Sequence, residues 1–112
     1  MVREASSGDE LTRVLTQADL VQYQVGAVVS RTLMKKPSGT VTAFAFDAGE
    51  GLSEHSSPFE ALLLVVAGEA EIEISGAGHT VRAGELLKLP ADKPHAVKAV
   101  KRFKMILVML KA

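Results

Sequence analysis

Residues 46–74 read FDAGEGLSEHSSPFEALLLVVAGEAEIEI, and this stretch decides the fold class. Its last six residues alternate glutamates with small or aliphatic residues: Glu69, Ala70, Glu71, Ile72, Glu73 and Ile74. That period of two is typical of a strand with one face in water and the other in a core. The apolar run 61–66 before it has the length of a buried strand. Gly68, between the two runs, predicts a hairpin turn.

Similar short runs fill most of the chain on either side of this stretch. Gly, Pro, Asp and Ser punctuate them, which is typical of strands joined by turns. Gly76 and Gly78 predict another hairpin turn. The alternating run that starts at Glu69 is predicted to continue as a strand to Ser75. The other predicted strands are 25–33, 40–46, 80–83, 85–89 and 103–110. Many short strands without alternating helices indicate an all-β fold, an antiparallel barrel or sandwich.

The first 19 residues follow a different pattern. Leu11, Val14, Leu15 and Ala18 have the i, i+3, i+4, i+7 spacing of one helical face. Ser7 and Glu10 have the spacing of a capping box, in which each side chain accepts a hydrogen bond from the other residue's backbone N–H. We therefore predict a helical segment over residues 1–19 and a β-barrel domain over residues 20–112.

Composition excludes several classes of protein. The 112 residues suit one domain, and 13 basic residues balance 13 acidic ones, so the basic excess of a nucleic-acid-binding protein is absent. The chain has no cysteine, which excludes disulfides and thiolate metal sites. The longest apolar run, residues 61–67, is too short to span a membrane, and the polar start lacks a signal-peptide core. These features predict a cytoplasmic protein with no nucleic-acid or membrane partner.

Two histidines lie in matching frameworks of glycine and proline. His55 follows Gly49 by six positions, and His95 follows Gly84 by eleven. The first framework contains Gly49, His55, Ser57, Ala61 and Gly68; the second, within HTVRAGELLKLPADKPHAV (79–97) and just beyond it, contains Gly84, Pro90, Asp92, His95 and Ala99. Over about residues 25–110 the chain resembles the cupin superfamily, as a small single-domain bacterial cupin. The resemblance implies a jelly-roll β-barrel, the double-stranded β-helix, with a pocket between its sheets.

The resemblance also implies a metal site, but an incomplete one. Metal-binding cupins usually hold a divalent ion such as Fe, Mn, Ni or Zn with three His and one Glu. Here His55 and His95 match that pattern, whereas Ser57 stands at the second His and Ala61 at the Glu. Since a hydroxyl is a poor substitute for an imidazole and a methyl group is none, two lost ligands should remove most of the affinity.

Glu60 is one position from the family's glutamate. Because strand side chains alternate between faces, Glu60 should point outward when Ala61 points inward, as a solvent-facing carboxylate. A bulge at Pro58 would change that phase and make Glu60 a third metal ligand. Ser57 is either a hydrogen-bonding pocket residue or a plain loop hydroxyl, and no partners at triad spacing make it a nucleophile.

Three functions are consistent with these residues. The first, which we favour, is a cupin that binds a small molecule through His55, Ser57 and His95 beside a degenerate metal site. The second is a metal-dependent dioxygenase or isomerase acting on a small organic acid or carbonyl compound. The third is a metal-free enzyme in which one histidine transfers a proton. Whether the protein is an enzyme at all stays open, because fold does not fix function.

Three further features have ordinary structural explanations. His79, beside Gly78, is expected in an exposed turn, and Lys88 is expected to extend its amine into water. Residues 105–110 are apolar on both faces of a predicted strand. One face should fill the barrel, while the other needs either the N-terminal segment or a second subunit. Small cupins of this type are commonly homodimers, so the resemblance implies a homodimer.

Overall fold

The computed structural model describes residues 2–4 and 11–111 and shows the predicted all-β jelly roll. Its elements are β1 (Val2–Glu4), the 3-10 helix η2 (Gln17–Asp19), β2 (Val28–Lys36), β3 (Gly39–Phe46), β4 (Gly51–His55), β5 (Phe59–Ile74), β6 (Ala77–Arg82), β7 (Leu86–Leu89), β8 (His95–Lys98) and β9 (Phe103–Lys111). No helix in the described part of the chain has the length and hydrophobicity needed to cross a bilayer.

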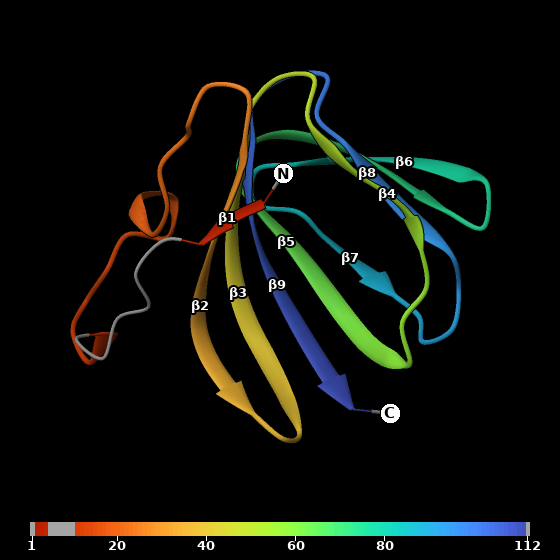
Figure 1. The fold of residues 1–112 in the computed structure, drawn as a ribbon, viewed down its shortest axis with the longest axis horizontal. Helices are drawn as coiled ribbons and strands as arrows, with labels where there is room; N and C mark the ends of the chain where they lie inside the picture. Colours follow the sequence, from red (N-terminus) through yellow and green to blue (C-terminus); the bar gives the residue numbers. More distant parts are fainter. Residues whose placement is uncertain (1, 5–10, 112) are drawn as a thin grey trace.

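The strands form two layers that curl toward each other (Figure 1). In the larger layer the order is β1-β2-β3-β9-β5-β7, and in the smaller it is β6-β5-β8-β4. Every neighbouring pair is antiparallel except β1 and β2, which run parallel. The strand β5 belongs to both layers, so it holds the half-barrel together.

Gly68 lies inside β5, so the predicted hairpin turn there is wrong. Residues before it pair with β7 and β9, and residues after it pair with β6 and β8. At φ +74° Gly68 adopts a conformation that suits glycine, and a Cβ there would overlap the carbonyl oxygen of Arg102. The register also shifts between Val65 and Ala67. Glycine therefore bends a continuous strand from one layer into the other, where the sequence alone suggests a chain reversal.

The other differences from the predicted strands are local. The strands β1, β4 and β8 were not predicted, because they are three to five residues long and β4 and β8 carry mixed polar residues. The turn predicted at Gly76 and Gly78 is narrower, since Gly78 already pairs with Glu73 in β6. His79 is exposed as expected, but it lies in β6 rather than in a turn.

The helix predicted near the N-terminus is not present among residues 11–19. Residues 17–19 form the short 3-10 helix η2, and Val14, assigned to the apolar face, is fully exposed. The predicted capping box of Ser7 and Glu10 falls outside the described residues. Tertiary contacts explain the extended path: the side chains of Lys104 and Arg31 donate to the carbonyls of Ala18 and Leu20, at 2.6 and 2.9 Å. These bonds hold the segment against the sheet without a helix.

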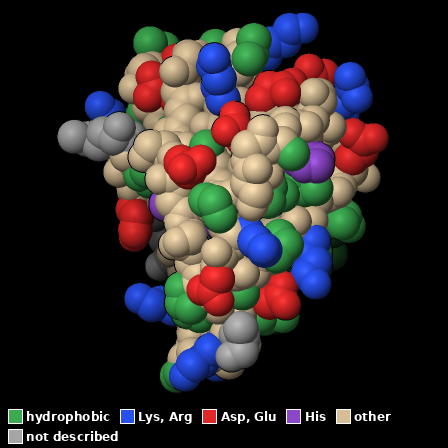
Figure 2. Space-filling model, turned by 90° about the vertical axis from the view of Figure 1, so that its right-hand side faces the viewer, with side chains coloured by type: hydrophobic (Ala, Val, Ile, Leu, Met, Phe, Trp, Pro, Cys, Tyr) green, Lys and Arg blue, Asp and Glu red, His purple; other side chains and the backbone are tan. Residues whose placement is uncertain are grey.

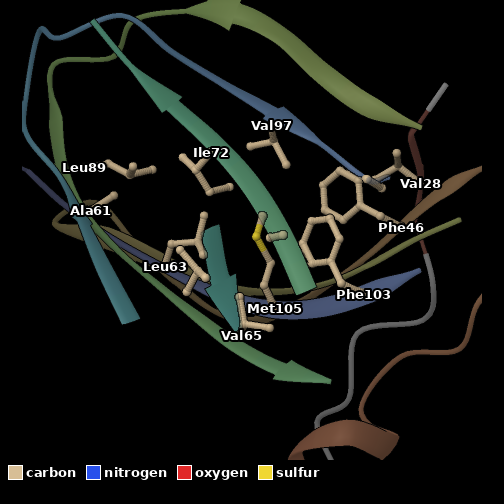
Figure 3. Packing of buried hydrophobic residues seen from close by; sticks show 13 residues of the cluster. Val28, Phe46, Ala61, Leu63, Val65, Ile72, Leu89, Val97, Phe103 and Met105 are labelled. Atoms are coloured by element: carbon tan, nitrogen blue, oxygen red, sulfur yellow. The ribbon is translucent and has the colours of Figure 1, made fainter. Parts of the chain in front are cut away.

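The space between the layers is filled by a continuous hydrophobic core (Figure 3). Phe46 and Phe103 stack with ring centroids 4.5 Å apart, and Val28 lies beside them. Ala61 and Leu89 lie at the other end of the labelled cluster. Six half-buried side chains pack against this core: Phe44, Leu52, Ile74, Leu87, Leu107 and Met109. The barrel interior is therefore packed rather than hollow.

A second, smaller core lies on the outer face of the larger layer. Residues of the N-terminal segment cover this face. The buried members of this second core are Leu20, Val21, Ala27, Val29, Ala43 and Ala45, and Leu15, Tyr23, Leu33 and Ile106 pack against them. Tyr23 lies between two cations, 5.0 Å from the Arg102 guanidinium and 4.8 Å from the Lys104 ammonium. Ile106 of β9 is thus covered within the monomer, whereas Val108 and Leu110 are not part of this cluster.

Candidate functional site

Two strand ends bring His55 and His95 together. His55 is the last residue of β4 and His95 the first of β8, and the two are opposite each other in the antiparallel register. Their rings meet edge to face, with centroids 4.3 Å apart. His95 also aligns with Ile74, and Val97, two residues on, is buried in the core, so the histidines face the space between the layers. The sequence-predicted pair is therefore a real cluster at the open end of the barrel.

Backbone carbonyls orient both imidazoles. The Nδ1–H of His55 donates to the Ser53 carbonyl at 2.7 Å, and that of His95 donates to the Lys93 carbonyl at 3.3 Å. Because a carbonyl only accepts, these bonds place the proton on Nδ1 in the neutral form of each ring. The Nε2 atoms are left to contact a ligand. Burial, opposed by the Lys93 hydrogen bond and reinforced by the nearby His55, holds the pKa of His95 below its ordinary value of 6.5.

Two connecting loops flank the histidines along the chain. One joins β4 to β5 and the other joins β7 to β8, and the Asp92 amide donates to the Ser57 carbonyl at 2.8 Å between them. Asp92 has φ +65°, a conformation that Asp tolerates better than most residues. The Ser57 hydroxyl accepts from the Phe59 amide at 3.2 Å. Ser57 is thus beside the site, while its hydroxyl already stabilises the turn before β5.

Glu60 lies on the opposite side of the sheet from the histidines. Ala61 belongs to the barrel core, and the alternation of β5 directs Glu60 to the outer face. Its Oε2 is 3.5 Å from the Lys88 Nζ, and both side chains are partly exposed. Lys88 therefore extends to the surface as expected. The bulge in β5 lies at residues 65–67 rather than at Pro58, so it does not change the phase of Glu60.

These residues do not fit a complete metal centre. Only two imidazoles converge, Ser57 is engaged by the backbone, and the side chain at position 61 is a methyl group in the core. No group of three or more His, Cys, Asp or Glu side chains that could hold a metal occurs in the described parts of the chain, 2–4 and 11–111. Protein metal sites with catalytic ions usually have three protein ligands, so the donor set is short by at least one.

Two hollows lie on the outer faces of the layers, and the histidines line neither of them. One of about 410 Å³ is on the outer face of the smaller layer, and one of about 540 Å³ is on the outer face of the larger layer. Neither is lined by His55, Ser57 or His95. Acidic and basic side chains are interspersed over the face shown in Figure 2. That mixed surface agrees with the zero formal net charge and gives no broad electrostatic field of one sign.

Comparison with known proteins fixes the family. The family model of the cupin domain matches residues 43–110, which include both histidines. The chain belongs to the cupin family. A search of curated proteins found no match. The cupin fold explains why β4 and β8 bring their ends together: in the jelly roll these strands are neighbours although 39 residues separate His55 from His95.

Several solved structures resemble most of the chain. A conserved protein of unknown function from Streptococcus pyogenes is 35% identical, with a TM-score of 0.87 over 92% of this chain and 90% of that one. A cupin superfamily protein from Desulfitobacterium hafniense is 30% identical, with a TM-score of 0.85 over 90% and 93% of the two chains. A cupin 2 conserved barrel domain protein from Leptotrichia buccalis is 40% identical, with a TM-score of 0.81; the match covers 84% of this chain and 46% of that protein.

Proposed function

We propose that this cupin binds a small organic molecule at the open end of its barrel and that it holds no tightly bound metal there. The observation that carries the proposal is the His55–His95 pair, whose Nδ1 atoms are anchored by carbonyls and whose Nε2 atoms are left to contact a ligand. Half-buried apolar side chains, including Ile74 and Met109, pack at the same core. Apolar walls with a few fixed polar groups are typical of small-molecule sites.

The chemistry of the pair favours a ligand with hydrogen-bonding oxygen atoms. With the pKa of His95 lowered, its imidazole is neutral at neutral pH and its Nε2 accepts a hydrogen bond. A hydroxyl or a protonated acid donates to that atom. When a carboxylate approaches, its charge favours protonation of an imidazole, which then donates. Small organic acids and carbonyl compounds are therefore the first ligands to test.

The test uses untagged protein with pyruvate, benzoate and acetoacetate as probes. Binding should raise the thermal midpoint and shift the imidazole nitrogen resonances of His55 and His95. Both effects should weaken in His55→Ala and His95→Ala, and they should persist in His79→Ala, because His79 is exposed on β6. Imidazole resonances that no probe of this class shifts would contradict the proposal.

The alternative is a metal-dependent dioxygenase or isomerase at the same place. It is favoured by one observation: metal-binding histidines usually donate their second ring nitrogen to a carbonyl or carboxylate, as both do here. Elemental analysis after dialysis, followed by titration with Fe, Mn, Ni and Zn, separates the two. Stoichiometric metal that is lost in His55→Ala would establish the alternative, and weak binding of every ion would support the metal-poor site.

We also propose that the protein is a cytoplasmic homodimer that forms through the outer face of its larger layer. The N-terminal segment covers the part of that face around Ile106. Beyond it, Leu62, Leu86 and Leu110 are 40%, 60% and 57% exposed. Leu62 aligns with Val108 of β9, and Leu64 aligns with Leu86 of β7. The exposed side chains are therefore neighbours across β9, β5 and β7. A contiguous exposed apolar patch is typical of an interface, and a second copy would cover it.

The variant Leu62→Lys tests this interface, and Val100→Lys is its control. Val100 is 62% exposed in the loop before β9 and lies outside the patch. A lysine there replaces an exposed aliphatic side chain with the same charge as Leu62→Lys does. Light scattering should show a dimer for the wild type and for Val100→Lys, and a monomer for Leu62→Lys. A monomeric wild type at high concentration would contradict the proposal.

A further inference from the structure

A third hollow lies between the N-terminal segment and the edge of the larger layer, far from the histidines in the chain. It has a volume of about 270 Å³. Its walls are Asp19, Leu20, Val21, Gln22 and Gln24 on one side and Val29 and Arg31 of β2 on the other. Leu20, Val21 and Val29 are buried and form an apolar floor, so the polar groups of the hollow are few and easily distinguished.

Among residues 2–4 and 11–111, no acidic side chain forms an ion pair with Arg31. Its Nη1 donates to the neutral carbonyl of Leu20 at 2.9 Å. Its Nε is buried and has no hydrogen-bond partner in the described part of the chain. None of the ion pairs in the described part of the chain includes Arg31, although Asp19 lines the same hollow. A half-buried guanidinium with a single neutral acceptor is under-satisfied, because burial weakens its hydration without replacing it.

A second guanidinium lies at the rim. Arg3 of β1 donates from Nη1 to the Gln24 Oε1 at 3.1 Å, and Gln24 lines the hollow. In the register of β1 and β2, Arg3 aligns with Val29, two residues before Arg31. Strand alternation therefore places the residues that carry these two guanidiniums on the same face. Two arginines and one aspartate give the surroundings of the hollow a net positive charge.

We propose that this hollow is a binding site for a small carboxylate. A guanidinium recognises a carboxylate by charge-assisted hydrogen bonds, and the ligand would supply the counter-charge that no described residue gives Arg31. The Asp19 carboxylate disfavours a second negative charge, so a monoanion fits better than a phosphate dianion. The volume suits a molecule of a few heavy atoms. The site is separate from the barrel mouth, and its existence does not depend on what the histidines bind.

Acetate titrated into the full-length, untagged, 15N-labelled protein at constant ionic strength tests the proposal. The backbone amides of residues 20–24 should shift and saturate. Sodium chloride should leave them in place, and inorganic phosphate should shift them less than acetate. The same titration of Asp19→Asn should saturate at a several-fold lower acetate concentration, because the like charge is gone.

The variants that remove the cation complete the test. Arg31→Gln should abolish the saturable shifts, and Arg31→Lys, which keeps the charge but loses the planar fork, should weaken them several-fold. His55→Ala should leave them unchanged, which separates this site from the barrel mouth. If Arg31→Gln fails to fold, the acetate titrations of Arg31→Lys and Asp19→Asn still test the proposal. Shifts that do not saturate, that chloride reproduces, that phosphate exceeds, or that ignore Asp19→Asn would overturn the proposal.

Discussion

Two side chains, Ser57 and Ala61, separate this chain from the ligand set that metal-binding cupins use. The structure shows what each does instead. Ser57 accepts a backbone hydrogen bond at the start of β5, and Ala61 is 8% exposed, opposite Leu89 and Met109 in the register. Ala61 thus contributes to packing at a position that points into the barrel. The resemblance to metal-binding cupins implies that ligands at these two positions would lie beside His55 and His95.

Restoring both ligands should therefore create a metal site. In Ser57→His/Ala61→Glu, two new donors would join His55 and His95, so we expect stoichiometric Ni or Zn binding by calorimetry where the wild type binds weakly. The new carboxyl in the core should lower the stability of the metal-free variant. The control is Ser56→His/Ala61→Glu, since residue 56 precedes the matching position by one. Equal metal affinity in the two variants would refute the residue assignment.

The lowered pKa of His95 should make stability depend on pH. In the unfolded chain this group has its ordinary pKa of 6.5, so on acidification it binds a proton before the folded protein does. Stability therefore falls as pH drops below 6.5 and is fully present above it. Urea unfolding at pH 7.5 and 5.5 should show this loss, and His95→Asn should show less of it. An identical loss in His95→Asn would assign the effect to other groups.

At the scale of the elements, β5 decides how the two layers are joined. It is 16 residues long and changes its pairing partners at Gly68. Alternation and apolar runs correctly located the residues of this strand on either side of the glycine. They did not show that the chain continues, because glycine punctuates hairpins and bends alike. The close approach of the Arg102 carbonyl, which requires glycine, comes from the residue before β9 and is visible only in the folded chain.

Gly68→Ala should be strongly destabilising. The added Cβ overlaps a backbone carbonyl that cannot move freely, and φ +74° is unfavourable for alanine, so we expect a loss of about 2–4 kcal/mol in urea unfolding. Gly76→Ala is the matched control: its φ is +83°, but no atom lies within 4 Å of the place that the new methyl group would occupy, so its cost should be about 1 kcal/mol. Similar losses for both would show that the contact with the start of β9 is unimportant.

At the scale of the whole molecule, the uncovered part of the outer face is the surface through which we propose that the protein dimerises. The apolar pattern of β9 predicted that both faces need cover but left the source open. In the structure the N-terminal segment covers only part of the outer face, around Ile106. The patch with Leu62 and Leu110 is exposed in the monomer.

A dimer that buries this patch should unfold at a temperature that rises with protein concentration, because mass action favours the associated folded state. We expect such a rise in scanning calorimetry for the wild type and for Val100→Lys. Leu62→Lys should unfold at a midpoint that is independent of concentration. A wild-type midpoint that ignores concentration would argue for a folded monomer with an uncovered patch.

The amino-acid sequence by itself determined the all-β class and most strand positions, because these follow from alternation and apolar runs along the chain. The resemblance to cupins pointed to His55 and His95 as members of one site. Only the tertiary structure decided the course of β5 through Gly68, the path of the N-terminal segment without a helix, and the buried Arg31 Nε that has no partner among the described residues. Each of these depends on groups distant in sequence that meet in space. No local sequence pattern predicts that the Arg102 carbonyl approaches Gly68 or that Lys104 bonds to a carbonyl 86 positions away. The same holds for the hollow between the N-terminal segment and β2.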